Sequence, residues 1–207
     1  MRKVKFMLVN YRFYLPVITI TPIKIGIFFL MCALIYWSHT SFPKINKRNL
    51  LKSLFTFYLL CVAQLTISIN IYTPRTYIEM LRSANGFGYF EAIEWHPLEM
   101  YKTIYTAASQ YTIVGNLVML IPLTLFISLL WEDKATFKKM FTISFLTSLT
   151  IETSQLLLSY IYLEHRLFDL NDLLQNTLGG LIGFVIFIGI RKIVPNLVSQ
   201  RKLTAKI

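Results

Sequence analysis

The chain alternates long apolar runs with short polar stretches. A helix needs roughly 20 mostly apolar residues to cross a hydrocarbon core about 30 Å thick. Five runs meet or nearly meet this length, and they lie at residues 17–37, 53–73, 111–131, 140–160 and 173–190. The second and third runs carry no charged residue. The pattern therefore predicts an all-α fold, a polytopic membrane helix bundle with about five transmembrane helices.

These runs divide the chain into three parts. Residues 1–52 hold the first predicted span and a basic loop, residues 53–190 hold the other spans as one transmembrane domain, and residues 191–207 form a basic tail. The last run is the shortest, so we expect its helix to begin about a turn earlier or to cross with little tilt. The basic N-terminus lacks an apolar core and a small-residue cleavage site, so no removable signal peptide is predicted.

Composition supports a membrane protein. Hydrophobic residues make up 55% of the chain and the mean hydropathy is +0.55, well above the balance of soluble proteins. The net charge of +11 raises nucleic acid as a partner, but Lys and Arg lie in short clusters between apolar runs and form no continuous basic face. We therefore expect a lipid bilayer with anionic head groups as partner, and no nucleic acid.

The distribution of basic residues predicts an orientation. One side of the five spans receives 12 Lys and Arg, in residues 38–52, 132–139 and 191–207. The other side receives 8 on longer segments, residues 1–16, 74–110 and 161–172. Positive charge is enriched in cytoplasmic loops. The sequence thus predicts a multi-pass protein of the cell membrane with its N-terminus outside and its C-terminus in the cytoplasm.

Four polar side chains from the third, fourth and fifth predicted spans lie within one layer near one membrane face. Glu152 is the only acidic residue well inside a span, and Gln155 follows on the same helix face. At about 1.5 Å per residue, Glu152 lies roughly 12 Å, Gln155 and Asn116 about 7.5 Å, and Asn176 about 4.5 Å from one membrane face. Because an ionisable group at such depth is costly, Glu152 needs a partner or a function. If the three helices are neighbours, these side chains meet in one layer.

The stretch "RLFDLNDLLQNTLGG" adds polar groups at the edge of this layer. Arg166, Asp169, Asp172 and Asn176 are spaced by 3, 3 and 4 residues, so the last three share one face if a helix begins near Asp169. Asp169 is then a plausible N-cap, and Asp172 lies in the first turn, where a carboxylate is favoured. Arg166 is a natural counter-ion for Glu152 or for the aspartates.

Several of these residues also have purely structural interpretations. Helix capping explains Asp169 as well as a chemical role does. Hydrogen bonds between helices are enough to explain Asn116 and Asn176. Gly179 and Gly183 have the spacing that lets membrane helices pack closely, either within the chain or in a homo-oligomer.

No metal site, cofactor or disulfide is predicted. Cys32 and Cys61 lie within apolar runs and are interpreted as small core side chains. The loop set formed by Glu91, Glu94, His96 and Glu99 matches no metal motif, so a solvated acidic loop is the favoured interpretation.

Three stretches together resemble a known family. They are "GNLVMLIPLTLF" (115–126), "IETSQLLLSY" (151–160) and "RLFDLNDLLQNTLGGLIG" (166–183). In this order they resemble the VanZ-like family of bacterial membrane proteins, named for a protein that lowers susceptibility to the glycopeptide teicoplanin. The motif-bearing resemblance covers residues 111–185. It places the family's recurrent positions at Asn116, Pro122, Glu152, Gln155, Arg166, Asp169, Asp172, Asn176, Gly179 and Gly180.

The resemblance has one departure and brings no defined reaction. Thr124 stands where the family usually has a glycine, which affects local helix packing and leaves the polar layer intact.

Three hypotheses follow. The first is a non-enzymatic envelope protein whose outward polar layer binds a cell-wall precursor, a lipid head group or a glycopeptide. Seven candidate residues form this layer: Asn116, Glu152, Gln155, Arg166, Asp169, Asp172 and Asn176. The alternative is an intramembrane enzyme acting on a lipid-linked substrate, with Glu152 and Asp172 as catalytic groups. A small transporter in which Glu152 titrates is the third.

Overall fold

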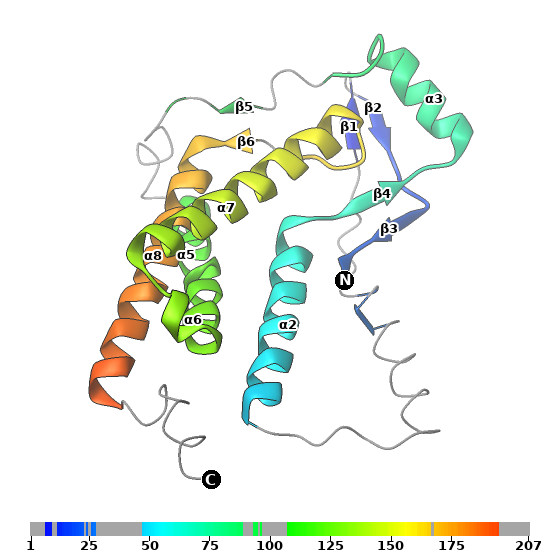
Figure 1. The fold of residues 1–207 in the computed structure, drawn as a ribbon. Coiled ribbons are helices and arrows are strands. Elements are labelled where there is room, and N and C mark those ends of the chain that lie inside the picture. The colour runs from blue at the N-terminus through cyan, green and yellow to red at the C-terminus, as the bar shows by residue number, and fades with distance from the viewer. Residues whose placement is uncertain are drawn as a thin grey trace, which may run out of the picture. The chain divides into compact units, whose positions relative to one another are not determined.

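The structure of the chain is a computed structural model (Figure 1). It describes residues 7–9, 12–22, 24, 26–27, 47–88, 93–94, 96, 107–166 and 168–194. Contacts divide these residues into two units, each assembled from three stretches of chain. The mixed unit draws on Met1–Lys44, Leu60–Trp95 and Ile151–Asp169, and the helical unit on Ile45–Leu59, His96–Thr150 and Leu170–Ile207. The division of the chain into three parts, with boundaries at residues 52 and 190, stays a prediction from the sequence.

Helices dominate the part of the chain that the structure describes. They are α2 (Lys47–Thr66), α3 (Pro74–Ser83), α5 (Ala107–Met119), α6 (Ile121–Leu130), the 3₁₀ turn η1 (Glu132–Lys134), α7 (Phe137–Tyr160) and α8 (Leu170–Ile193). The short strands are β1 (Met7–Val9), β2 (Arg12–Tyr14), β3 (Ile18–Ile20), β4 (Ile69–Ile71), β5 (Ile93–Glu94) and β6 (Phe168–Asp169).

Within the part of the chain that the structure describes, three helical segments are long and apolar enough to cross a membrane. They are Arg48–Thr66, Gln110–Leu130 and Leu170–Ile193, and they overlap the second, third and fifth predicted runs. The fourth run is helical as well, within α7, but Glu152 and Gln155 lower its hydropathy. The predicted helical membrane bundle is thereby confirmed.

Two predicted boundaries are wrong, because β-branched residues at the ends of apolar runs form strands. Ile18–Ile20 was predicted as the start of the first span, but it forms β3 and pairs antiparallel with β4. Helix α2 accordingly ends at Thr66, several residues before the predicted end of the second span. Short apolar runs rich in isoleucine suit strands as well as helices, and hydropathy alone does not distinguish them. Residues 28–37 of the first run lie outside the described residues.

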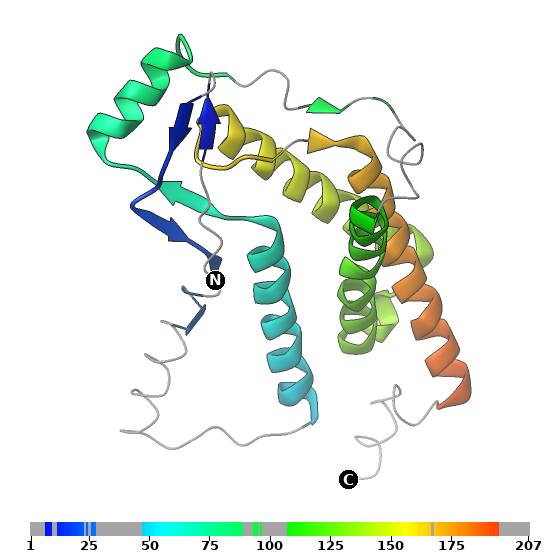
Figure 2. The same cartoon turned by 180° about the vertical axis from the view of Figure 1, so that it is seen from behind.

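In the helical unit, α8 packs along α5 and α6 (Figures 1 and 2). The third predicted run is not one continuous helix: it breaks at Leu120 because Pro122, in the first turn of α6, has no N–H to continue the ladder of α5. Met140, Phe184 and Phe187 form the apolar core. Arg191 at the end of α8 lies 3.4 Å from the carboxylate of Glu132.

The glycines of α8 permit this packing. A Cβ on Gly179 would overlap the carbonyl oxygen of Leu117, and one on Gly183 would overlap that of Ile121. The close packing predicted for the two glycines is therefore made with α5 and α6 of the same chain. A homo-oligomer through this face stays a prediction.

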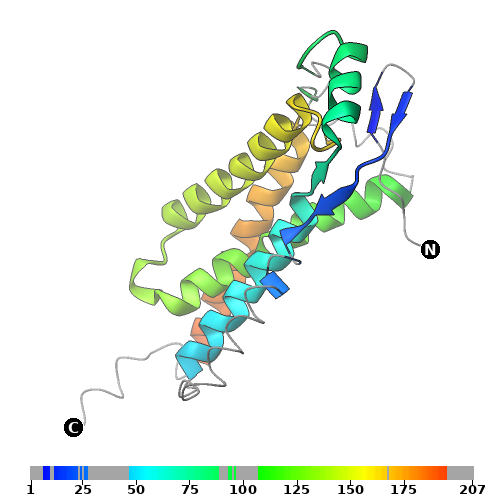
Figure 3. The same cartoon turned by 90° about the vertical axis from the view of Figure 1, so that its right-hand side faces the viewer.

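The mixed unit combines short strands with α3. The hairpin β1–β2 lies beside α3, and β3 lies beside β4 (Figures 1 and 3). Its core contains Val9, Tyr14, Tyr72, Met80 and Tyr162.

Two further contacts order α3 within this unit. The helix begins after Thr73, whose hydroxyl accepts a hydrogen bond from the Thr76 N–H. The hydroxyl of Tyr77 donates to the Ile161 carbonyl at 3.0 Å, and burial raises the pKa of this tyrosine, so it stays a donor at neutral pH.

We expect Gly179→Ala to destabilise the protein by about 1–3 kcal/mol, because the added methyl group would force α8 away from the backbone of α5. Gly189→Ala on the same helix is the matched control, since a Cβ there meets no atom within 4 Å. The free energy of unfolding in detergent micelles measures both. Equal stability of the two variants would contradict the packing.

Candidate functional site

One face of α7 carries a line of buried polar side chains. Ser144, Ser148, Glu152, Gln155 and Ser159 are each at most 4% exposed. Their spacing of 4, 4, 3 and 4 residues places them along one side of the helix. Of these five, the sequence pattern marks only Glu152 and Gln155 as candidates. The serines at the same helical spacing were a signal that could have extended the set.

Glu152 has a definite partner. Its Oε2 accepts a hydrogen bond from the backbone N–H of Asp169 at 3.1 Å. Asp169 directly precedes α8, as predicted for an N-cap position, and Asp172 lies in the first turn of that helix. The first N–H groups of a helix lack partners within the helix, and negative charge is favoured there. The Glu152 carboxylate therefore binds the peptide group that leads into α8.

Gln155 and Arg166 serve the end of another helix. The side-chain amide of Gln155 donates to the Thr66 carbonyl at 2.9 Å, and Nη2 of Arg166 donates to the Leu65 carbonyl at 2.9 Å. These carbonyls belong to the last turn of α2, where partners are missing and a cation is favoured. The two side chains thus cap the C-terminus of α2.

The backbone of Arg166 is held separately. The Ser159 hydroxyl donates to the Arg166 carbonyl at 2.7 Å, and the Arg166 N–H donates to the Ser159 oxygen at 3.0 Å. This reciprocal pair ties the loop after α7 back to the last turn of that helix, and it fixes the point from which the guanidinium projects.

A buried carboxylate that the sequence analysis missed lies beside Arg166. Glu164 is 3% exposed, and its Oε1 accepts hydrogen bonds from the N–H and the hydroxyl of Ser68 at 3.2 and 2.9 Å. The same oxygen lies 3.6 Å from Nε of Arg166. Glu164 stands in a loop without a recognisable motif, so no sequence signal marked it. It compensates part of the charge of Arg166.

The helical unit holds the remaining candidates. The amide of Asn116 on α5 donates to Oε1 of Gln175 on α8 at 3.3 Å, and the amide of Asn176 donates to the Ser148 hydroxyl at 3.2 Å. Asp172 is half-buried near the start of α8. These contacts are hydrogen bonds between helices, as the structural interpretation of the two asparagines predicts.

Thr124 takes part in the same packing. Its hydroxyl, fully buried, donates to the Gly180 carbonyl at 2.6 Å. The departure from the family's glycine therefore adds a hydrogen bond between α6 and α8.

The seven candidate residues fall into two groups. Glu152, Gln155, Arg166 and Asp169 belong to the mixed unit, and Asn116, Asp172 and Asn176 to the helical unit. That all seven form one site stays a prediction. Among the described residues, no group of three His, Cys, Asp or Glu side chains is arranged to hold a metal ion. Of the loop set considered for a metal, Glu91 and Glu99 lie outside the described residues.

We expect Glu152→Leu to destabilise the protein by about 1–3 kcal/mol, because it leaves the half-buried Asp169 N–H without this acceptor. Glu152→Gln keeps an acceptor oxygen and should cost less. Thr153→Leu, at the neighbouring exposed position of α7, is the control. Unfolding free energies in micelles check the series, and a Glu152→Leu variant as stable as the control would show that this hydrogen bond does not stabilise the fold.

The family comparison covers most of this region. The model of the VanZ/LLP1 family matches residues 55–193, more than half of the chain, and all seven candidate residues lie within the match. No curated protein and no solved structure matches the chain.

Proposed function

Because the chain belongs to the VanZ/LLP1 family, we propose that it is a multi-pass bacterial membrane protein that binds an anionic group of a cell-wall precursor or of a glycopeptide. Binding there would lower susceptibility to glycopeptides such as teicoplanin. The three membrane-length apolar segments of the described residues support the location.

Arg166 carries the proposal. Its side chain is 48% exposed although its neighbours Glu164 and Ser159 are buried. Nη2 and Nε are oriented by Leu65 and Glu164. A guanidinium held in this way presents its remaining donors to phosphate or carboxylate without further loss of side-chain freedom.

The described contacts favour binding over catalysis. One carboxylate oxygen of Glu152, the candidate general acid or base, is bound to a backbone N–H, and the side chain is 2% exposed. A catalytic carboxylate must reach its substrate, directly or through one water. The enzyme alternative, with Glu152 and Asp172 as catalytic groups, therefore has no described contact in its favour.

The proposal puts Arg166 on the outer side of the membrane, because the basic residues are denser in the loops on the opposite side. In a chain with Cys32→Ser and Cys61→Ser, we expect His165→Cys to react with an impermeant maleimide on intact cells. Asp133→Cys, from the loop 132–139, should react only after permeabilisation. The reverse labelling pattern would place Arg166 in the cytoplasm and contradict this orientation.

Expression of the chain in a glycopeptide-susceptible bacterium should raise the minimum inhibitory concentration of teicoplanin, and Arg166→Gln should largely abolish the rise. The lost charge-assisted bonds are worth about 1.5–3 kcal/mol, which weakens binding about tenfold or more. Arg75→Gln is the control: Arg75 is 90% exposed and pairs with Glu79 on α3.

Each variant must be present in the membrane at the wild-type level. If Arg166→Gln does not accumulate, Arg166→Lys replaces it in the test, because lysine keeps a cation near the Leu65 carbonyl. The resistance role is overturned if neither expression of the chain nor deletion of its gene changes the inhibitory concentration of teicoplanin. A rise that Arg166→Gln fully retains would overturn the role of Arg166.

A further inference from the structure

The paired strands β3 and β4 of the mixed unit have an apolar outer face. In their register, Ile18 lies opposite Ile71. Ile20 lies opposite Ile69 in the same way, so the four side chains share one side of the ribbon, here called the isoleucine face. Ile18 is 55% exposed and Ile71 is 40% exposed, and the other two are partly exposed. An antiparallel ribbon in water shows the reverse, with apolar side chains packed inward and polar ones outside.

The polar side chains of the ribbon lie on its other face and are buried. Asn70 is 6% exposed, and its Oδ1 accepts a hydrogen bond from the Thr19 hydroxyl on the opposite strand at 2.9 Å. Ser68 and Tyr72 flank β4 and are buried as well, at 6% and 8% exposure. Because side chains alternate along an extended chain, these residues share the side of Asn70. The ribbon therefore turns its polar groups into the protein and its isoleucines outward.

The backbone of the ribbon has partners beyond the pairing of the two strands. The N–H of Asn70 donates to the Leu163 carbonyl at 2.8 Å, and Nζ of Lys24 donates to the Thr19 carbonyl. A strand edge in a bilayer has no water to complete its hydrogen bonds, so it must find partners within the protein. These bonds allow the ribbon to lie where water is scarce.

The apolar exposure of the ribbon follows directly from a membrane span in the sequence. Arg48–Thr66 is long and apolar enough to cross a membrane, and Leu65 in its last turn is 64% exposed. Strand β4 begins at Ile69, shortly after that turn. Ahead of β3, Leu15 and Val17 are 59% and 63% exposed. Exposed apolar surface that adjoins a span is typical of contact with lipid.

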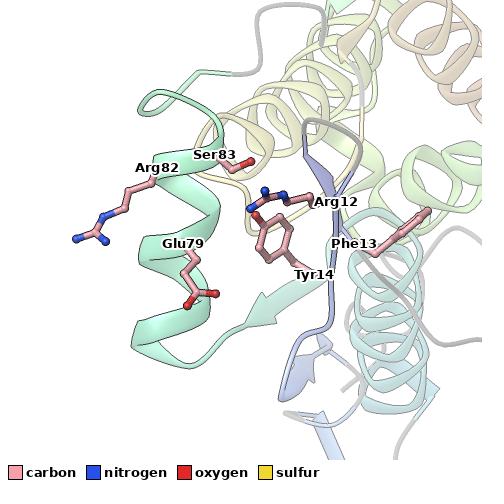
Figure 4. A pocket seen from close by; sticks show the side chains of 6 residues that line it. All are labelled: Arg12, Phe13, Tyr14, Glu79, Arg82 and Ser83. Carbon is pink, nitrogen blue, oxygen red and sulfur yellow. The ribbon is translucent and has the colours of Figure 1, made fainter.

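Helix α3, which follows β4, has the opposite polarity. Its exposed face contains Arg75, Glu79 and Arg82 together with Ile78, at helical spacings of 3 and 4 residues. Figure 4 shows Glu79 and Arg82 projecting from the helix, with Arg82 directed away from β2. Charged groups at this density need water. The mixed unit therefore changes from an apolar to a charged surface between β4 and α3.

We propose that the isoleucine face of the β3–β4 ribbon lies against the acyl chains of one membrane leaflet, next to the end of α2. Lipid covers the isoleucines, and the protein shields the polar face that contains Thr19 and Asn70. The chain then enters the aqueous phase at the start of α3. The contact does not involve the guanidinium of Arg166, so the proposal stands apart from the function proposed above.

The test uses the full chain with Cys32→Ser and Cys61→Ser in vesicles of phosphatidylcholine and phosphatidylglycerol. A nitroxide label is attached to Ile18→Cys or to Ile71→Cys, one position at a time. Ile78→Cys is the matched control, because Ile78 is also an exposed isoleucine, at 47%, but lies on the charged face of α3. Electron paramagnetic resonance measures the collision rates of each label with oxygen, which concentrates among acyl chains, and with a neutral nickel chelate, which stays in water.

We expect the ratio of oxygen to nickel collision rates to be about tenfold or more higher at Ile18 and Ile71 than at Ile78. The reason is that the polar chelate is excluded from the acyl region. A label at Phe57→Cys, on the exposed surface of α2, gives the reference value for lipid contact. Because Ile18 and Ile71 are exposed, their variants should keep the unfolding temperature of the cysteine-free chain.

Two results would overturn the proposal. A ratio at Ile18 and Ile71 equal to that at Ile78 would place the ribbon in water. Low collision rates with both reagents, together with dipolar broadening between labels, would show that a second copy of the chain covers the isoleucine face in place of lipid.

Discussion

A peptide group buried in a membrane protein has no water to replace a missing hydrogen bond, so each helix end must find partners within the protein. The polar face of α7 and the loop after it meet this demand in the mixed unit. Gln155 and Arg166 bind the last carbonyls of α2, and Glu152 binds the N–H of Asp169, next to the start of α8. The acceptor end of α2 thus receives an amide and a cation, and the positive charge agrees with the dipole of that helix.

The same constraint explains the residues between helices. Close approach of α8 to α5 and α6 requires glycine at 179 and 183, and it brings the Thr124 hydroxyl within 2.6 Å of the Gly180 carbonyl. Asn116 and Asn176 add amide hydrogen bonds to Gln175 and Ser148. Polar residues of a membrane-embedded motif can thus be needed for assembly alone. In the mixed unit Arg166 differs, since its guanidinium is both anchored and half exposed.

Much of the fold was predictable from hydropathy and from turn chemistry. The membrane-length segments, the early start of α8 and the acidic first turn of that helix all follow from local patterns that the structure confirms. The strands do not. Ile18–Ile20 and Ile69–Ile71 are apolar runs compatible with either structure, and the choice depends on their pairing with each other, 51 residues apart in the sequence. A window that averages hydropathy along the chain contains no information about such a partner.

The sequence by itself determined that Glu152 needs a partner, because an isolated carboxylate at that depth costs too much free energy. It also determined which residues carry the family motif. Only the tertiary structure decided that the partner is a backbone N–H, that Arg166 and Gln155 meet the end of α2, and that Glu164 lies beside Arg166. The reason is physical: side-chain chemistry states what a group requires, but many donors and carbonyls satisfy it equally. Which of them lies within 3 Å is set by how distant segments pack.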